Sequence, residues 1–170
     1  MINHAAASCL MLLFLSPMPD FAGQDISRPE LPAFYAILAT VRAAVEPRCD
    51  ALEVRRLAML LDVARQTQQQ IDCDGYLLRG RKRFMGLMFS DEQLDLVIVL
   101  TDPDEHEAYA DTLRAQHGEP THDSEIDLYF YDAAVALRSE PHEVVFVSKR
   151  VRAQYQLYMD SMAGEAEKPQ

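Results

Sequence analysis

Four basic side chains within five residues are the strongest candidates for chemistry in this sequence: Arg79, Arg81, Lys82 and Arg83. They surround Gly80 between two apolar runs, where a hairpin tip is expected. Guanidinium donors match the geometry of carboxylate and phosphate oxygens, so we predict that these four residues bind a carboxylate, a phosphate or an acidic protein face. Two other interpretations stay open: a solvated turn that protects a sheet edge, or an internal partner for the acidic residues concentrated between positions 91 and 127.

A second group of side chains could bind a metal ion. His117 and His122 flank a turn, and Asp123 and Glu125 follow closely. Two imidazoles and a carboxylate could together hold zinc, which takes three or four such ligands. The chain has no compact two-histidine helical motif, and His117 also suits the negative end of a helix. We therefore expect no metal site and no cofactor.

Strings typical of known catalytic sites are missing from the sequence. There is no glycine-x-serine-x-glycine elbow to expose a nucleophile, and no glycine-rich loop before a helix to hold a phosphate. We therefore predict no catalytic residues. A small enzyme with an unrecognised site remains an alternative.

The negative charge of the chain is concentrated in one segment. The formal net charge is −11, and between residues 91 and 127 twelve acids face a single base, Arg114, which accounts for all of it. We call residues 91–127 the acidic window. Such a field repels nucleic-acid phosphates, so no nucleic-acid partner is expected. It can instead steer a basic protein partner or simply form a solvated surface. The acids are Asp91, Glu92, Asp95, Asp102, Asp104, Glu105, Glu107, Asp111, Glu119, Asp123, Glu125 and Asp127.

The N-terminus has the layout of a secretory signal peptide. The apolar run Ala5–Leu15 is followed by prolines and by the small pair Ala22 and Gly23. We predict a signal peptide over residues 1–23, a single domain over 24–163 and a flexible tail over 164–170. The run is shorter than the roughly 20 residues that a membrane-spanning helix needs, so no integral span is expected. A buried N-terminal helix is the alternative.

Two helices are predicted next. Apolar residues recur at helical spacing over Phe34–Val45, and Pro47 ends that element. Asp50 and Glu53 form a capping box, and the pattern after them predicts a helix that continues to Gln70. Adjacent helices of this kind predict a helical hairpin.

The pattern then changes to short apolar runs. Tyr76–Arg79, Phe84–Phe89 and Leu94–Leu100 predict a three-strand meander. Asp102, followed by proline and two acids, predicts a helix start before Ala108–His117, which Gly118 closes. Three further strands and a last helix follow, at Ile126–Tyr131, Ala133–Leu137, Val144–Val147 and Val151–Met162.

These elements predict an α+β fold. An N-terminal helical hairpin precedes two strand-strand-strand-helix units, which form a largely antiparallel sheet with helices packed on it. Cys49 and Cys73 would remain after removal of the signal peptide. If Asp50–Ile71 is one helix, its ends lie about 36 Å apart, whereas bridged α-carbons lie within about 7 Å. The expected helix therefore predicts two free thiols.

Together, these features favour an exported, non-catalytic binding or adaptor protein that acts through protein-protein contacts in the periplasm or outside the cell. The element order across Leu31–Met162 is similar to that of small acidic type III secretion chaperones. That resemblance implies a cytosolic, chaperone-like protein as the alternative.

Overall fold

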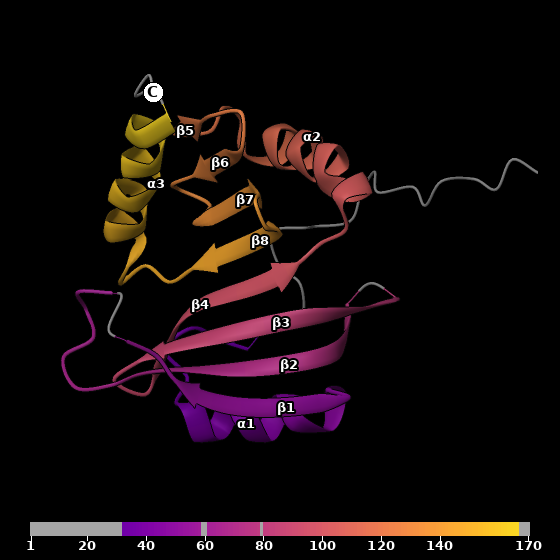
Figure 1. The fold of residues 1–170 in the computed structure, drawn as a ribbon, viewed down its shortest axis with the longest axis vertical. Coiled ribbons are helices and arrows are strands. Elements are labelled where there is room, and N and C mark those ends of the chain that lie inside the picture. Colours follow the sequence, from indigo (N-terminus) through magenta and orange to yellow (C-terminus); the bar gives the residue numbers. More distant parts are fainter. Residues whose placement is uncertain (1–31, 59–60, 79, 167–170) are drawn as a thin grey trace, which may run out of the picture.

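The computed structural model describes residues 32–58, 61–78 and 80–166, and its core is one eight-stranded antiparallel sheet with the order β1-β2-β3-β4-β8-β7-β6-β5 (Figure 1). The predicted signal peptide lies outside these residues, and the last helix runs three residues into the predicted tail. None of the described helices is long and apolar enough to cross a membrane. The elements are α1 (Leu38–Val45), η1 (Glu46–Arg48), β1 (Ala51–Arg56), β2 (Gln68–Leu78), β3 (Arg81–Ser90), β4 (Gln93–Leu100), η2 (Pro103–Glu105), α2 (His106–His117), β5 (His122–Asp123), β6 (Asp127–Phe130), β7 (Val135–Ser139), β8 (His142–Val147) and α3 (Arg152–Ala166).

Two four-strand halves join in the middle of the sheet. The chain builds β1 to β4 as consecutive neighbours, crosses through α2 to the far edge, and returns inward from β5 to β8. β4 then pairs antiparallel with β8, with Leu96 opposite Val147 and Leu100 opposite Glu143. Four strands therefore precede a helix in each half, so each predicted strand-strand-strand-helix unit is one strand short.

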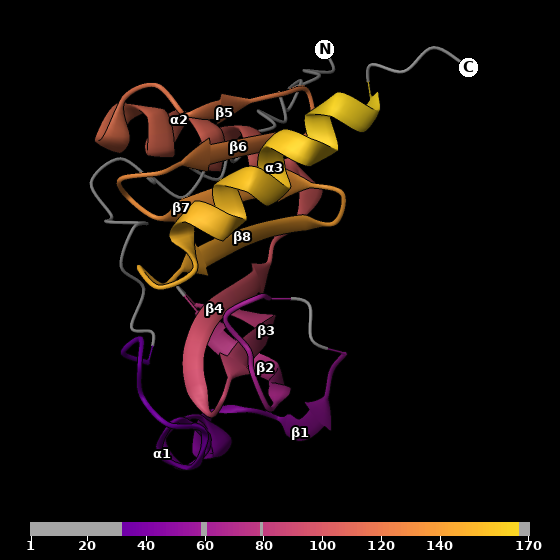
Figure 2. The same ribbon diagram turned by 90° about the vertical axis from the view of Figure 1, so that its left-hand side faces the viewer.

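The two faces of the sheet are covered by different elements. Helices α2 and α3 lie on opposite sides of β5–β8 (Figure 1), and α1 packs beside β1–β4 on the same face as α2. Figure 2 shows α3 lying across β6, β7 and β8, while the segment between β1 and β2 lies lower on that side. One apolar core thus forms under α1 and α2, and a second, smaller core forms under α3 and that connecting segment.

The predicted helix after Asp50 is wrong. Ala51–Arg56 is strand β1, and the glutamines expected to end the helix open β2. Leu52 and Val54 alternate with charged residues, a spacing that also fits a strand. Once β1 pairs with β2, both side chains pack against the larger core. The apolar residues between the strands pack instead on the smaller core. Tertiary pairing therefore overrides a local pattern that also fits a helix.

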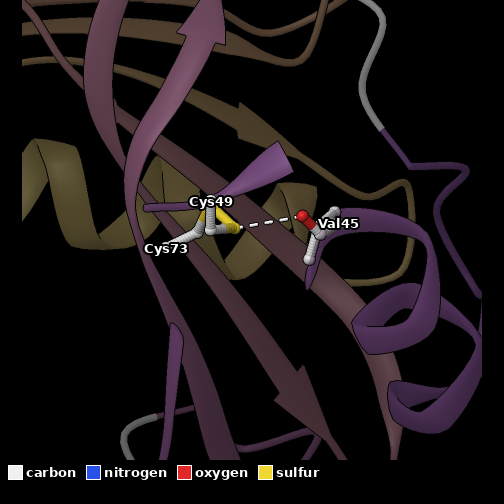
Figure 3. Close-up of a disulfide and its surroundings, with 3 residues drawn as sticks. All are labelled: Val45, Cys49 and Cys73. Carbon is white, nitrogen blue, oxygen red and sulfur yellow. Dashed lines mark hydrogen bonds between the residues drawn. A yellow bond between two sulfur atoms is a disulfide. The ribbon is translucent and has the colours of Figure 1, made fainter. Parts of the chain in front are cut away.

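The prediction of free thiols is also wrong, because it depended on that helix. Cys49 and Cys73 form a disulfide, with their α-carbons 5.4 Å apart (Figure 3). Antiparallel pairing places Ala51 opposite Asp74, so the residues just before β1 return to the middle of β2. The Sγ atom of Cys49 also lies 3.1 Å from the carbonyl oxygen of Val45, at the end of α1. The bridge therefore joins α1 to the sheet beneath it.

Several local predictions are confirmed. Strands β3 and β4 are buried along most of their length, as apolar residues on both faces require. Asp102 and Glu105 form a reciprocal capping box at the start of η2, which continues into α2. Gly118 closes α2 with a φ of 78°, a left-handed conformation that favours glycine.

Candidate binding site

The basic residues singled out in the sequence are paired with acids of the same molecule. Arg81 lies 2.9 Å from Asp102 and 3.1 Å from Glu105 through its Nη1 atom. Lys82 donates to both carboxylate oxygens of Asp50, at 2.7 and 2.6 Å. Arg79 lies outside the described residues. Pairing with the acidic window, which the sequence left open, is thus present for Arg81, whereas Lys82 pairs with Asp50 outside that window. Binding of an outside anion at this hairpin remains a prediction.

Arg83 is the most deeply placed of these bases. Its side chain is 6% exposed, and its Nη2 atom donates to both carboxylate oxygens of Glu105, at 2.7 and 2.6 Å. Glu105 in turn accepts the backbone N–H of Asp102 in the capping box. A bidentate, charge-assisted pair therefore joins the start of β3 to the first turn before α2. This ion pair holds two elements of the fold together and does not form a ligand site.

Three of the four residues considered for zinc contact other groups. The ring of His117 packs against Phe130, with the ring centroids 6.0 Å apart. His122 Nδ1 lies 3.3 Å from Asp160 on α3, and Asp123 pairs with Arg114 at 3.2 Å. Throughout the part of the chain that the structure describes, no group of three or more histidine, cysteine, aspartate and glutamate side chains is placed to hold a metal ion.

The acidic window divides into interior and surface residues. Four of its acids bind inward: Asp91 to backbone N–H groups, and Asp95, Glu105 and Asp127 to arginines. The carboxylate of Asp91 accepts N–H groups from three consecutive residues, 65–67, and so fixes the segment between β1 and β2. The other eight acids are exposed. Those exposed acids are Glu92, Asp102, Asp104, Glu107, Asp111, Glu119, Asp123 and Glu125.

A partly open cavity of about 480 Å³ lies between α3 and the sheet. Its floor comes from β3, β4, β7 and β8, and its walls come from α3 and from the segment between β1 and β2. Most of the lining is apolar, whereas one arginine and one glutamate stand among the apolar groups. The lining residues are Leu61, Met88, Leu96, Ile98, Arg138, Glu143, Val145, Gln154, Tyr155 and Tyr158.

Buried polar contacts fix the walls of this cavity. Asp95 on β4 is fully buried and accepts hydrogen bonds from Ser148 Oγ at 2.8 Å and from Arg150 Nε at 3.0 Å. Arg150 also donates to the carbonyl oxygen of Ser90, at the end of β3. These bonds hold the turn before α3 against the sheet. The bonds to Asp91 hold the opposite wall, so the cavity has fixed rather than loose borders.

The charged groups of the cavity belong to a row of three charges on neighbouring strands. Register places Arg138 of β7 beside Asp127 of β6 and Glu143 of β8. Arg138 Nε lies 3.3 Å from Asp127 Oδ1, and its Nη1 lies 2.9 Å from Glu143 Oε1. Burial raises the pKa of Glu143 above its ordinary value, an effect that Arg138 opposes. Two buried carboxylates thus share one guanidinium.

Tyrosine rings form the α3 wall. Tyr155 is buried, and its ring centroid lies 5.2 Å from that of Tyr129 in the core and 5.8 Å from that of Tyr158. Burial raises the pKa of Tyr155 far above its ordinary value, so its hydroxyl stays neutral and can donate or accept a hydrogen bond. Tyr158 is 42% exposed at the edge of the cavity. The wall is therefore aromatic from the core to the surface.

Sequence reasoning did not identify this cavity. Its lining comes from six segments spread between Leu61 and Tyr158, and no spacing rule joins them. The one available signal was the helical spacing of apolar residues within Val151–Met162, a pattern that includes Tyr155 and Tyr158 and that usually marks packing. Arg138 gave no signal, because an isolated arginine in a strand is ordinary.

Comparison with known proteins gives this chain no relatives. No family, no curated protein and no solved structure matches it. The candidate function therefore rests on the cavity, the charges and the disulfide described above.

Proposed function

We propose that the protein is an exported, non-catalytic binding protein that recognises a protein partner through the cavity between α3 and the sheet. The cavity of about 480 Å³ carries the proposal. Its size falls within the range of small ligand and side-chain pockets, and an apolar lining with a few fixed polar groups is typical of such sites. The partner is expected to insert an apolar segment there.

The surroundings of the cavity favour a macromolecule over a small ligand. Tyr158, on the α3 wall of the cavity, is 42% exposed. Leu100, 36% exposed, stands opposite Glu143 in the β4–β8 pair. Exposed apolar side chains that continue outward from a pocket are typical of protein-protein contact surfaces. A partner chain can cover this rim, whereas a small molecule fills only the cavity.

Export is supported by the disulfide. Bridges such as Cys49–Cys73 persist in oxidising compartments and are rare in the cytosol. This bridge agrees with the signal peptide predicted over residues 1–23. It disfavours the cytosolic, chaperone-like alternative, in which the thiols would stay reduced.

N-terminal sequencing of protein from fractionated cells tests the compartment. A chain that begins near Gln24, recovered outside the cytosol, is expected. A chain that still begins at Met1 and stays in the cytosolic fraction would refute export and favour the chaperone-like alternative.

Peptide display tests the binding site. Libraries are selected on the wild-type protein and on Ile98→Trp, which places a large ring in the cavity from its β4 floor. Ile37→Trp is the matched control, because Ile37 is 51% exposed and precedes α1 on the other face of the sheet. We expect the selected peptides to bind wild type and Ile37→Trp and to lose binding to Ile98→Trp. Undiminished binding to Ile98→Trp would exclude the cavity.

A further inference from the structure

We propose that the anchor which this cavity receives is an arginine side chain of the protein partner, with its guanidinium at Glu143 and its aliphatic stem on the apolar floor. This inference rests on the proposed function and names the chemistry of its ligand. Three observations carry it: the charge balance of the buried row, the unpaired half of one carboxylate, and the lining of the cavity.

The charge balance leaves room for a cation. Asp127 and Glu143 are 3% and 6% exposed, and Arg138 is the base that both contact. Among the described residues, no other base lies within ion-pair distance of either carboxylate. The row therefore holds two negative charges and one positive charge away from water. A buried surplus charge is costly, and an entering cation relieves that cost.

Glu143 is the carboxylate of the row that a ligand can reach. It lines the cavity, whereas Asp127 does not. Its Oε1 atom accepts from Arg138, and within the described part of the chain its Oε2 atom has no hydrogen-bond donor. Arg138 is held by carboxylates on both sides and by the carbonyl oxygen of Glu140, so its charge is compensated. An incoming donor therefore meets an acceptor rather than a free cation.

The rest of the lining suits an arginine more than a compact cation. Met88, Ile98 and Val145 offer an apolar floor for an aliphatic stem. Tyr155 and Tyr158 offer ring faces, on which a guanidinium stacks favourably. The guanidinium of Arg138 already lies 6.0 Å from the ring centroid of Tyr158. The net charge of −11 also attracts basic partners over longer distances.

Short peptides that differ by one charge test the proposal. The probes are acetyl-leucyl-arginyl-leucine amide and the same peptide with citrulline, which keeps the shape of arginine without its charge. Calorimetric titration of the purified protein is expected to show at least about tenfold tighter binding of the arginine peptide. Equal affinity for the two peptides would overturn the inference.

Variants locate the effect at the carboxylate. Glu143→Gln keeps the shape of the side chain and is expected to weaken the arginine peptide about tenfold while leaving the citrulline peptide unchanged. Glu107→Gln is the matched control, because Glu107 is exposed on α2, across the sheet from the cavity. Unchanged arginine binding by Glu143→Gln would refute the assigned contact.

The remaining outcomes separate this inference from the proposed function. If both peptides bind equally and both are lost in Ile98→Trp, the cavity binds partners but the arginine anchor is wrong. If neither peptide binds, both proposals fail. Agmatine carries the same guanidinium and stem without a peptide, and it is expected to bind at least about tenfold more weakly than the arginine peptide. Equal binding of agmatine would assign the site to small cations and overturn the protein-borne anchor.

Discussion

Arg83 and Glu105 form a buried ion pair in which one guanidinium nitrogen contacts both carboxylate oxygens, at 2.7 and 2.6 Å. The pair joins β3 to the turn that starts α2, two elements of opposite charge in the sequence. Four bases near a hairpin tip and twelve acids in one window look like two surfaces in the sequence. In the fold, Arg83 of the basic group and Glu105 of the acidic window bind each other.

Removal of either partner of this pair is expected to destabilise the protein strongly. Among the described residues, Arg83→Ala leaves buried Glu105 with only half-exposed Arg81, at 3.1 Å. Within the same part of the chain, Glu105→Ala leaves buried Arg83 with only exposed Asp102, at 3.7 Å. Each change is expected to cost up to about 3 kcal/mol of unfolding free energy. The double change Arg83→Met with Glu105→Leu should recover most of that loss. Lys82→Ala is the control, because Lys82 is 63% exposed and its pair with an exposed aspartate is worth under about 1 kcal/mol. Urea denaturation measures all four, and equal losses for Lys82→Ala and Arg83→Ala would contradict the assignment.

The disulfide is expected to contribute substantially to stability. Cys49 and Cys73 close a loop with a sequence separation of 24, and loop entropy of that length corresponds to about 3 kcal/mol. Thermal unfolding with and without a reducing agent should show a lower melting temperature for the reduced wild type. The double variant Cys49→Ser with Cys73→Ser should melt at that lower temperature, and its melting temperature should not change when reductant is added. A reductant effect that survives in the double variant would point to another cause.

Asp91 is expected to hold the cavity wall through its charge. Three backbone N–H groups lower the pKa of this carboxyl below its ordinary value of 3.8. Its contribution to stability is therefore complete above that value and is lost as pH falls through the lower, folded-state pKa. In Asp91→Asn, hydrogen exchange of the amides of residues 65–67 should be faster at neutral pH. Asp62→Asn, an exposed change in the same segment, should leave those amides unchanged. Equal exchange in both variants would refute the role of Asp91.

His106 is expected to make the protein less stable in mild acid. Burial lowers the pKa of His106 below its ordinary value of 6.5, and the neighbouring His142 adds to this effect, although Asp127 opposes it. Between the two pKa values the unfolded chain binds the proton more strongly than the folded protein does. Stability is therefore complete above pH 6.5 and declines as pH falls through that interval.

The variant His106→Phe removes this titration. Its melting temperature should change less than that of wild type between neutral pH and a pH just below the interval. The ring of His106 lies 5.4 Å from that of His142 at a steep angle, and phenylalanine preserves that contact. Parallel pH profiles for the two proteins would show that His106 does not titrate as stated.

Binding through the basic hairpin can be separated from binding through the cavity. The variant Arg81→Ala with Lys82→Ala removes two exposed bases and leaves Arg83 in its buried pair. We expect it to bind the display-selected peptides as wild type does, because neither side chain lines the cavity. If the variant no longer binds those peptides, the binding site includes the basic hairpin that the sequence indicates.

The helix error after Asp50 shows where local patterns stop. A capping box, an apolar face and glutamines all favour a helix there, and each is a signal that a short peptide contains. The same residues alternate well enough to form β1, because Leu52 and Val54 find the core once β2 lies beside them. The disulfide prediction failed for the same reason, since the distance between Cys49 and Cys73 depends on that strand pair.

The sequence by itself determined the features that depend on neighbours along the chain. Asp102 starts a helix and Gly118 ends one because their side chain and backbone act within one turn. Strands β3 and β4 are apolar on both faces and therefore lie inside the sheet. Only the tertiary structure decided that Arg83 is buried, that Cys49 meets Cys73, and that Glu143 lines a cavity under Tyr155. The pairs Arg83–Glu105, Cys49–Cys73 and Glu143–Tyr155 are 22, 24 and 12 positions apart along the chain. Such distances are set by strand pairing and core packing, which no local pattern encodes.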